Sequence, residues 1–264
     1  MVNAPSPRPW VLAESTWPEV RAKPFEVALL PWGATEAHNT HLPYATDSIQ
    51  VEAVAIAAAG IAWERGARVT VLPTIPFGVQ TGQREVPLSL NMMPSTQLAV
   101  VRDMLPSLRE HGVRKLVIVN GHGGNDFKPL IRELQPEAGL LLSLVNWYSA
   151  VNPAPFFAAP GDHAGELETS VMQRLAPSLV RPLGEAGPGA ARPSRIAGFR
   201  DGFAWTPRHW VSVTDDTGVG DPSQATAAKG AKFLDAVVER FAAFIVELAA
   251  ADPADLYTPN PTRT

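Results

Sequence analysis

Carboxylates and imidazoles gather in three short segments of this 264-residue sequence. In the first, GATEAH at residues 33–38, Glu36 and His38 stand two residues apart, and Asp47 follows nine residues later. Alternate side chains on an extended backbone point to the same side, so this pair can face one ligand. Another interpretation stays open: Glu36 lies on the surface and Asp47 caps a helix that begins at Ser48, because isolated E-x-H matches are common.

The second segment is NGHGGN at residues 120–125, directly after the apolar run 115–119. Glycine allows close approach of the backbone, so the turn can clear space for a ligand beside His122. It also leaves the backbone N–H groups of Gly123 and Gly124 free to bind an oxyanion. The alternative is a tight strand-to-helix turn in which the histidine is incidental.

The third segment, DHAGELETS at residues 162–170, places His163 at the mouth of an expected helix and Glu168 in its first turns. A first-turn acid is also favoured by the helix dipole alone, and Glu166 fits a solvated helix position. His163 itself can be a proton shuttle, a metal ligand or a structural hydrogen-bonding group.

Together the segments supply three carboxylates and three histidines, and the sequence has no cysteine. Disulfides, thiolate metal sites and cysteine nucleophiles are therefore excluded. Oxygen and imidazole ligands suit zinc or manganese, with iron possible, rather than copper(I) or iron–sulfur clusters. We predict two divalent metal ions per chain, with Asp47 able to bridge them. The isolated His111 is expected on the surface at a helix end.

Apolar runs alternate with helical patterns, which predicts an α/β fold with a parallel or mixed sheet covered on both faces. In such sheets ligands bind beyond the carboxyl ends of the strands. Glu36 and His38 follow the first expected strand, and His122 follows the third. The expected strands are 26–32, 68–72, 115–119 and 140–145, and the expected helices are 48–64, 95–111, 127–134, 164–175 and 223–250.

We predict one domain over residues 1–264, with a loose N-terminal arm at 1–9 and a long loop excursion at 181–222 that holds at most short strands. Ser95 is expected to be the N-cap of the helix over residues 95–111. Asp221 is expected to cap the last helix, with Pro222 in its first turn.

Composition excludes several classes of protein. The formal net charge is −4, so the chain lacks the excess of basic residues that is typical of nucleic-acid-binding proteins. It also lacks a cationic amphipathic segment and a long apolar span, so membrane binding is not expected. The N-terminus MVNAPSPRPW lacks the apolar core of a signal peptide. A cytoplasmic protein is therefore expected.

Four segments of this sequence resemble the signature segments of the creatininase family, in the family's order and over most of the chain. They are LPWGATEAHNTHLPYATDS at 30–48, NGHGGN at 120–125, HAGELETS at 163–170 and GDPSQAT at 220–226. The resemblance implies a three-layer α/β/α sandwich with a mostly parallel central sheet, a binuclear metal centre and, usually, a homohexamer.

The resemblance also implies the reaction. A metal-bridging hydroxide would attack the carbonyl carbon of a small cyclic or linear amide or formamide, and the C–N bond would break as His163, which matches the family's catalytic histidine, passes the proton to the leaving nitrogen. When the family's ligands are carried over by position, Glu36 and His122 would hold one metal. His38 and Glu168 would hold the other, and Asp47 would bridge the two.

This sequence departs from creatininase proper around the substrate. Gly123 and Gly124 stand where that enzyme has a bulkier residue and a glutamate, and Ala159 stands where it has a ring-covering tryptophan. Residues 78–90 lack its phenylalanine-proline-glycine pattern. We expect the metal centre without the creatinine pocket. Two other functions stay open, a metal-dependent isomerase or lyase on a small polar substrate and a catalytically silent metal-binding scaffold; release of amine, ammonia or formate from amides distinguishes the hydrolase from both.

Overall fold

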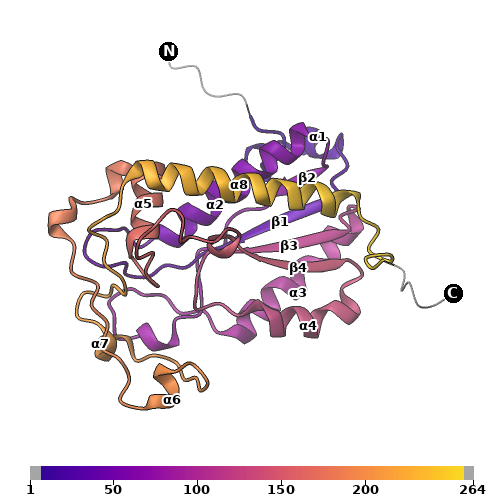
Figure 1. Cartoon of the computed structure of the whole chain (residues 1–264). Coiled ribbons are helices and arrows are strands. Elements are labelled where there is room, and N and C mark those ends of the chain that lie inside the picture. Colours follow the sequence, from indigo (N-terminus) through magenta and orange to yellow (C-terminus); the bar gives the residue numbers. More distant parts are fainter. Residues whose placement is uncertain (1–6, 259–264) are drawn as a thin grey trace.

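The four apolar runs form one sheet, whose strands lie in the order β2-β1-β3-β4 (Figure 1). The computed structural model describes residues 7–258 and gives β1 Val27–Trp32, β2 Val69–Val71, β3 Lys115–Asn120 and β4 Leu141–Asn146. All three neighbouring pairs are parallel. The prediction of an α/β fold with a parallel sheet is confirmed.

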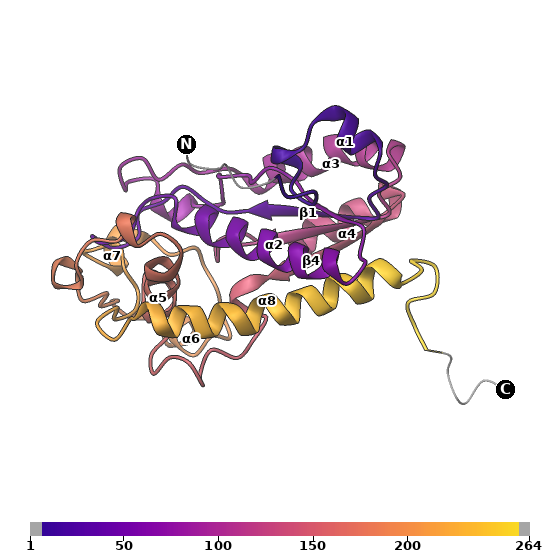
Figure 2. The same cartoon turned by 90° about the horizontal axis from the view of Figure 1, so that it is seen from above.

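Successive residues of each strand point to opposite faces, and each face packs against its own helices. Val27 and Leu29 belong to one core with residues of α2 (Thr46–Glu64), α5 (Glu166–Leu175) and α8 (Ala227–Ala250). Ala28, Leu30 and Trp32 belong to the other core, with residues of α3 (Pro94–Glu110) and α4 (Phe127–Ala138). Figures 1 and 2 show these two helical layers on either side of the sheet, with the short α1 (Trp17–Arg21) near the N-terminal end.

The helices α2 and α5 each begin two residues from their predicted starts at 48 and 164, and the caps predicted for two further helices are wrong. The last helix begins at Ala227, and its cap is Thr226, whose side chain accepts a hydrogen bond from the Lys229 N–H. Asp221 instead accepts from the Ser223 N–H, in a bend before the helix.

The helix expected from Ser95 begins one residue earlier, at Pro94, after Met93 as its N-cap. Proline suits the first turn because its fixed φ matches the helix and it has no N–H to satisfy. The helix α4 also runs four residues past its predicted end at residue 134 and ends at Ala138. The next residue, Gly139, has a φ of 65°, the left-handed conformation in which glycine commonly ends a helix.

The excursion at 181–222 folds into short helices rather than strands: η5 (Leu183–Glu185), α6 (Ala197–Arg200) and α7 (Trp210–Val213). In Figure 1 the segment around α6 projects away from the sheet, whereas α7 returns toward the carboxyl ends of the strands. Beyond α7, Val219 pairs with His163 in an isolated antiparallel bridge. The returning end of the excursion therefore contacts a predicted site residue.

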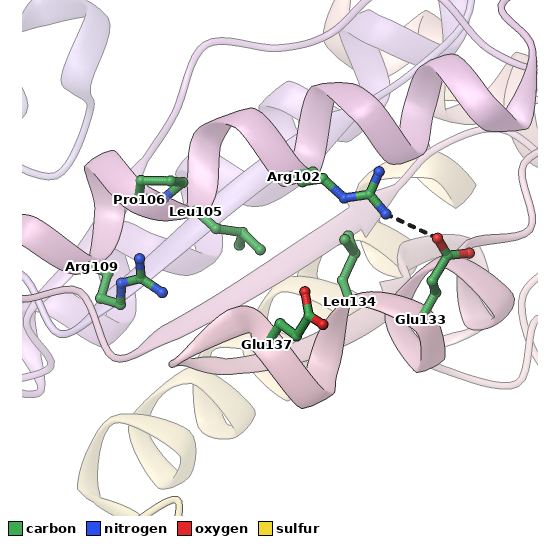
Figure 3. Close-up of a pocket in the computed structure, with 7 residues that line it drawn as sticks. All are labelled: Arg102, Leu105, Pro106, Arg109, Glu133, Leu134 and Glu137. Atoms are coloured by element: carbon green, nitrogen blue, oxygen red, sulfur yellow. Dashed lines mark hydrogen bonds and ion pairs between the residues drawn. The ribbon is translucent and has the colours of Figure 1, made fainter.

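A groove of about 160 Å³ lies between α3 and α4, where Arg102 and Glu133 form an ion pair of 2.9 Å (Figure 3). Its lining comes from the second halves of both helices, which lead into the amino ends of β3 and β4. The groove therefore lies away from the edge of the sheet where ligands are expected. Among residues 7–258, no helix has the length and apolarity needed to cross a membrane.

Gly230 sets how closely α5 and α8 pack, because a β-carbon there would collide with the backbone carbonyl of Ser170 in α5. We expect Gly230→Ala to push the helices apart and to lower the free energy of unfolding by about 1–3 kcal/mol, the usual cost of overpacking. Urea unfolding would measure this. In the control Gly184→Ala the new methyl meets no atom within 4 Å, so the midpoint should stay unchanged; equal midpoints for both variants would contradict the packing argument.

Candidate metal centre

The three chemical segments meet at the carboxyl edge of the sheet. Glu36 and His38 lie in the loop after β1, and His122 lies just beyond β3. Asp47 and Glu168 come from the first turns of α2 and α5. Parallel strands all end at the same edge of the sheet. The helices that follow them start at this edge and lead the chain back to the opposite edge.

Two groups of potential ligands share Asp47. Glu36, Asp47 and His122 form one group, and in each group the ligand atoms lie within 4.8 Å of one another. His122 Nδ1 is 2.9 Å from Glu36 Oε1 and 3.1 Å from Asp47 Oδ2. His38, Asp47 and Glu168 form the other group, with His38 Nε2 3.1 Å from Asp47 Oδ1 and 3.9 Å from Glu168 Oε2. The grouping matches the pairs carried over by position, and the role of these residues as ligands stays a prediction.

Each histidine of the centre has one ring nitrogen at a backbone carbonyl and turns the other toward the carboxylates. His38 Nδ1 is 3.1 Å from the Glu36 carbonyl, and His122 Nε2 is 3.0 Å from the Val79 carbonyl. A carbonyl can only accept, so these nitrogens carry the proton of the neutral ring. The free lone pairs are then on His38 Nε2 and His122 Nδ1, as a metal ligand requires.

The centre buries several like charges. The side chains of Glu36, Asp47 and His38 are at most 2 % exposed, and that of Glu168 is 21 % exposed. Burial by itself raises the pKa of Asp47, but the charge of His38 and the hydrogen bonds from His122 and His38 outweigh it and hold that pKa below its usual value. The pKa of Glu36 is also lowered: burial opposes this, and the charge of His122 outweighs it.

The imidazoles respond in the opposite direction. Burial lowers the pKa of His38, but the nearby Asp47 outweighs it and raises the value to about 10. The pKa of His122 is raised well above its usual value, with Glu36 outweighing burial. For Glu168 burial dominates and raises the pKa. Without a metal, bound protons on the imidazoles balance the carboxylates, and a cation that binds here displaces those protons.

Unpartnered oxygens fit a cation. Within residues 7–258, Glu36 Oε1 and Asp47 Oδ2 are buried and have no partner other than His122 Nδ1, which donates to them only when the ring is protonated. When the His122 ring is neutral, with its proton on Nε2 at the Val79 carbonyl, Nδ1 becomes a third acceptor beside these two oxygens. Acceptors alone repel, and a positive ion between them satisfies all three. The donor set of carboxylates and imidazoles suits zinc or manganese.

His163 stands beside the same cluster. Its Nε2 is 2.8 Å from the Ala37 carbonyl, and its Nδ1 is 3.8 Å from Glu36 Oε1. The residue lies three positions before α5, because that helix begins at Glu166 rather than at the predicted residue 164. Glu36, His38 and His163 also form a third group whose ligand atoms lie within 4.8 Å of one another, so geometry allows both a proton shuttle and a ligand.

Glycines leave room for the His122 ring. A β-carbon at Gly124 would collide with His122 Nε2 and the Val79 carbonyl, and one at Gly78 would lie 2.7 Å from His122 Cδ2. At Gly123, by contrast, a β-carbon would meet nothing within 4 Å. Gly123 and Gly124 are exposed, and within the described chain neither N–H donates a hydrogen bond. Their predicted oxyanion role is untested.

Asparagines hold the turn around His122. Asn120 Oδ1 accepts from the His122 N–H at 3.1 Å and from Asn125 Nδ2 at 3.0 Å. Asn125 Oδ1 accepts from the Val79 N–H at 3.0 Å, which holds the loop residue whose carbonyl accepts the hydrogen bond from His122 Nε2. These contacts orient the imidazole through the backbone on both sides.

Gln83 is a residue of the centre that sequence reasoning missed. It lies in η2 (Thr81–Gln83), is buried, and donates a hydrogen bond from Nε2 to Glu36 Oε2. Residues 76–91 lack a regular hydrophobic period, so no local signal marked a buried glutamine there. A carboxylate that binds a metal through one oxygen is commonly oriented by a hydrogen bond to the other.

The remaining histidines do not join the ligand groups. His41, which the sequence analysis did not consider, is buried with Nε2 2.9 Å from Thr169 Oγ1, and burial lowers its pKa to about 4. His111 is exposed at the end of α3, as predicted. His209 is exposed and pairs with Glu85 at 3.1 Å.

Comparisons with known proteins identify the family of this chain. The family model for creatininase, described as creatinine amidohydrolase, matches residues 13–245. This chain belongs to the creatininase family. The mycofactocin precursor peptide peptidase of Mycobacterium tuberculosis is 31 % identical to it over 230 residues, 80 % of this chain and 81 % of the relative. The creatinine amidohydrolase of Pseudomonas putida is 29 % identical over 195 residues, 64 % and 73 % of the two chains.

Solved structures of the creatininase family share the fold. A Bacteroides fragilis protein whose proposed name is creatinine amidohydrolase is 43 % identical, with a TM-score of 0.87 over 94 % of this chain and 98 % of its own. A creatininase mutant in a Zn–Zn form has 25 % identity and a TM-score of 0.74 over 91 % and 98 % of the two chains. A manganese form of creatininase has 25 % identity and a TM-score of 0.71 over 92 % of this chain and 99 % of its own.

The NGHGGN turn of this creatininase-family chain supports a matched pair of variants. We expect Gly124→Ala to displace the His122 ring and to weaken zinc binding by at least about tenfold, as loss of ligand orientation does. Competition with a chromophoric chelator would measure the affinity. Gly123→Ala is the control, since its methyl has open space; wild-type affinity in Gly124→Ala would show that the ring is not confined there.

Gln83→Leu keeps the side-chain size and removes the hydrogen bond to Glu36. We expect zinc affinity at one of the two sites to fall by about 10–100-fold, the usual effect of losing such an orienting contact. Stepwise zinc titration would resolve the two sites. The exposed Gln224→Leu is the control, and equal titration curves for the two variants would exclude a role for Gln83.

Proposed function

We propose that this chain is a metal-dependent hydrolase that cleaves the C–N bond of a small cyclic or linear amide or formamide. The observation that carries the proposal is the buried cluster of three carboxylates and oriented imidazoles at the carboxyl edge of the sheet. Membership of a family whose named relatives are an amidohydrolase and a peptidase supports hydrolysis of an amide-type bond.

We propose two divalent ions per chain, zinc or manganese. Glu36 and His122 would hold one, His38 and Glu168 the other, and the two oxygens of Asp47 face the two groups separately. The Zn–Zn and manganese forms of related creatininases support this choice. When bound, the two ions would supply an acidified water and polarise the amide carbonyl.

His163 is proposed to move the proton. Because Nε2 donates to the Ala37 carbonyl, Nδ1 keeps its lone pair on the side of the cluster. A neutral imidazole in this orientation can take a proton and give it to the leaving nitrogen. The unengaged N–H groups of Gly123 and Gly124 are proposed to stabilise the developing oxyanion.

The substrate is proposed not to be creatinine. Ala159, at the position of the ring-covering tryptophan, is exposed and engages only Glu166 through its N–H, at 3.0 Å. No flat aromatic side chain stands there to cover a ring. The peptidase name of several relatives brings peptides into the range of amides to be tested.

The test is a substrate panel with zinc- or manganese-loaded protein. The panel contains formamides, small cyclic amides, linear amides, short peptides and creatinine, and release of amine, ammonia or formate is measured. We expect turnover of at least one amide class within the ordinary enzyme range of about 1–1000 per second, and little or none of creatinine. Metal-loaded protein that hydrolyses no amide while isomerising or cleaving a polyol would favour a lyase or isomerase instead.

Metal stoichiometry follows from the shared aspartate. We expect elemental analysis of freshly prepared protein to give two divalent ions per chain, and Asp47→Ala to lose both, because each group depends on one of its oxygens. Reconstitution that saturates at one ion, or an Asp47→Ala variant that keeps one ion tightly, would contradict a bridging role.

The role of His163 is separated from metal binding by two variants. We expect His163→Ala to keep both ions while turnover falls by about a hundredfold or more, the usual contribution of a proton-transfer group. His122→Ala should lose metal as well as activity. Loss of an ion from His163→Ala would make His163 a ligand, and near-normal turnover would exclude the shuttle.

A further inference from the structure

The returning end of the excursion packs directly against His163. The His163 ring packs against two others: the His38 ring at 4.1 Å between centroids and 35° between planes, and the Trp210 ring at 5.3 Å and 86°. Trp210 is the first residue of α7 and is 6 % exposed. An aromatic edge-to-face contact at this distance is a favourable and directional one.

The hydrogen bonds of His163 leave one rotation of its ring unrestrained. Its backbone is paired with Val219 at 2.8 and 2.9 Å, and Nε2 is held by the Ala37 carbonyl. A ring fixed at its Cβ and at the opposite nitrogen can still turn about the axis between these points. That turn moves Nδ1 toward or away from Glu36, so the packing of neighbouring rings against the imidazole limits its direction.

Trp210 is itself held firmly. Its Nε1–H donates to the Thr217 carbonyl at 3.0 Å, and the Arg208 guanidinium lies 4.5 Å from its ring centre. Arg208 in turn pairs at 2.6 Å with Asp162, the residue directly before His163. The indole also packs with Ala37, Val86 and Val219. A side chain restrained by these contacts keeps one conformation and can hold a neighbouring ring in place.

We propose that Trp210 is a positioning residue for His163, which keeps Nδ1 of the imidazole directed at the metal centre. This inference rests on the proposed function for its catalytic consequence, because it assumes that His163 moves the proton. It gives residues 207–219 a role in the site, because Trp210 and Val219 of this segment both contact His163.

The first experiment does not need a substrate. Diethyl pyrocarbonate modifies unprotonated imidazoles, and the rate at His163 is read by peptide mass spectrometry against His209, whose side chain is 58 % exposed. His163 is 9 % exposed and confined, so we expect slow modification in the zinc-loaded wild type and at least about tenfold faster modification in Trp210→Ala and Trp210→Leu. Trp210→Phe, which keeps a flat ring, should stay near the wild-type rate.

The second experiment uses the amide that the panel shows to react fastest. We expect Trp210→Leu to lower kcat by about tenfold to a hundredfold with KM little changed, because a misdirected proton-transfer group affects the chemical step. Trp210→Phe should recover most of the loss. In a His163→Ala background the same Trp210→Leu change should cost nothing further, since a residue that acts through His163 has no effect once it is gone.

Controls separate positioning from folding and from metal binding. Zinc content and circular dichroism must match the wild type, and Trp17→Ala removes a tryptophan that is 72 % exposed in α1. An unchanged modification rate of His163 in both Trp210→Ala and Trp210→Leu would overturn the inference, even if no amide in the panel reacts. Faster modification with unchanged kcat, or a full additional loss in the His163→Ala background, would also overturn it.

Discussion

Three carboxylates share a space from which water is largely excluded, and the rest of the site follows from the need to compensate their charge. Glu36, Asp47 and Glu168 can remain ionised together only beside positive charge. The raised pKa values of His38 and His122 show the response of the metal-free chain, in which imidazolium protons balance the acids. Divalent ions fit the same positions because each imidazole already has its other nitrogen committed to a backbone carbonyl.

The sheet supplies the geometry for this compensation. Parallel strands end at one edge, so the loops after β1 and β3 bring Glu36 and His122 together from residues far apart in the chain. The first turns of α2 and α5 supply Asp47 and Glu168, and helix N-termini favour acidic side chains. Gly230 allows α8 to pack closely against the backbone of α5, the helix that carries Glu168.

Around this centre the structure shows which residues border the candidate site. The glycines of NGHGGN serve His122 unequally, since Gly124 is required for the position of the ring and Gly123 faces open space. The segments that complete the site, residues 76–91 and 207–219, supply Gln83 and Trp210 rather than ligands. The family has both an amidohydrolase and a peptidase among its named members. This is consistent with one kind of metal centre whose surrounding residues differ between members.

The sequence by itself determined the strands, the five long helices to within about four residues at each end, and the carboxylates and imidazoles of the candidate site, because these depend on local periodicity and on residue chemistry. It also located Glu36, His38 and His122 after strands, since parallel sheets place ligands there. Tertiary structure alone decided the pairing of ligands around Asp47, the tautomers set by the Val79 and Ala37 carbonyls, and the contacts of Gln83 and Trp210. Those two residues lie in segments without a regular period, and their positions depend on hydrogen bonds and packing between residues distant in sequence, which no local pattern records.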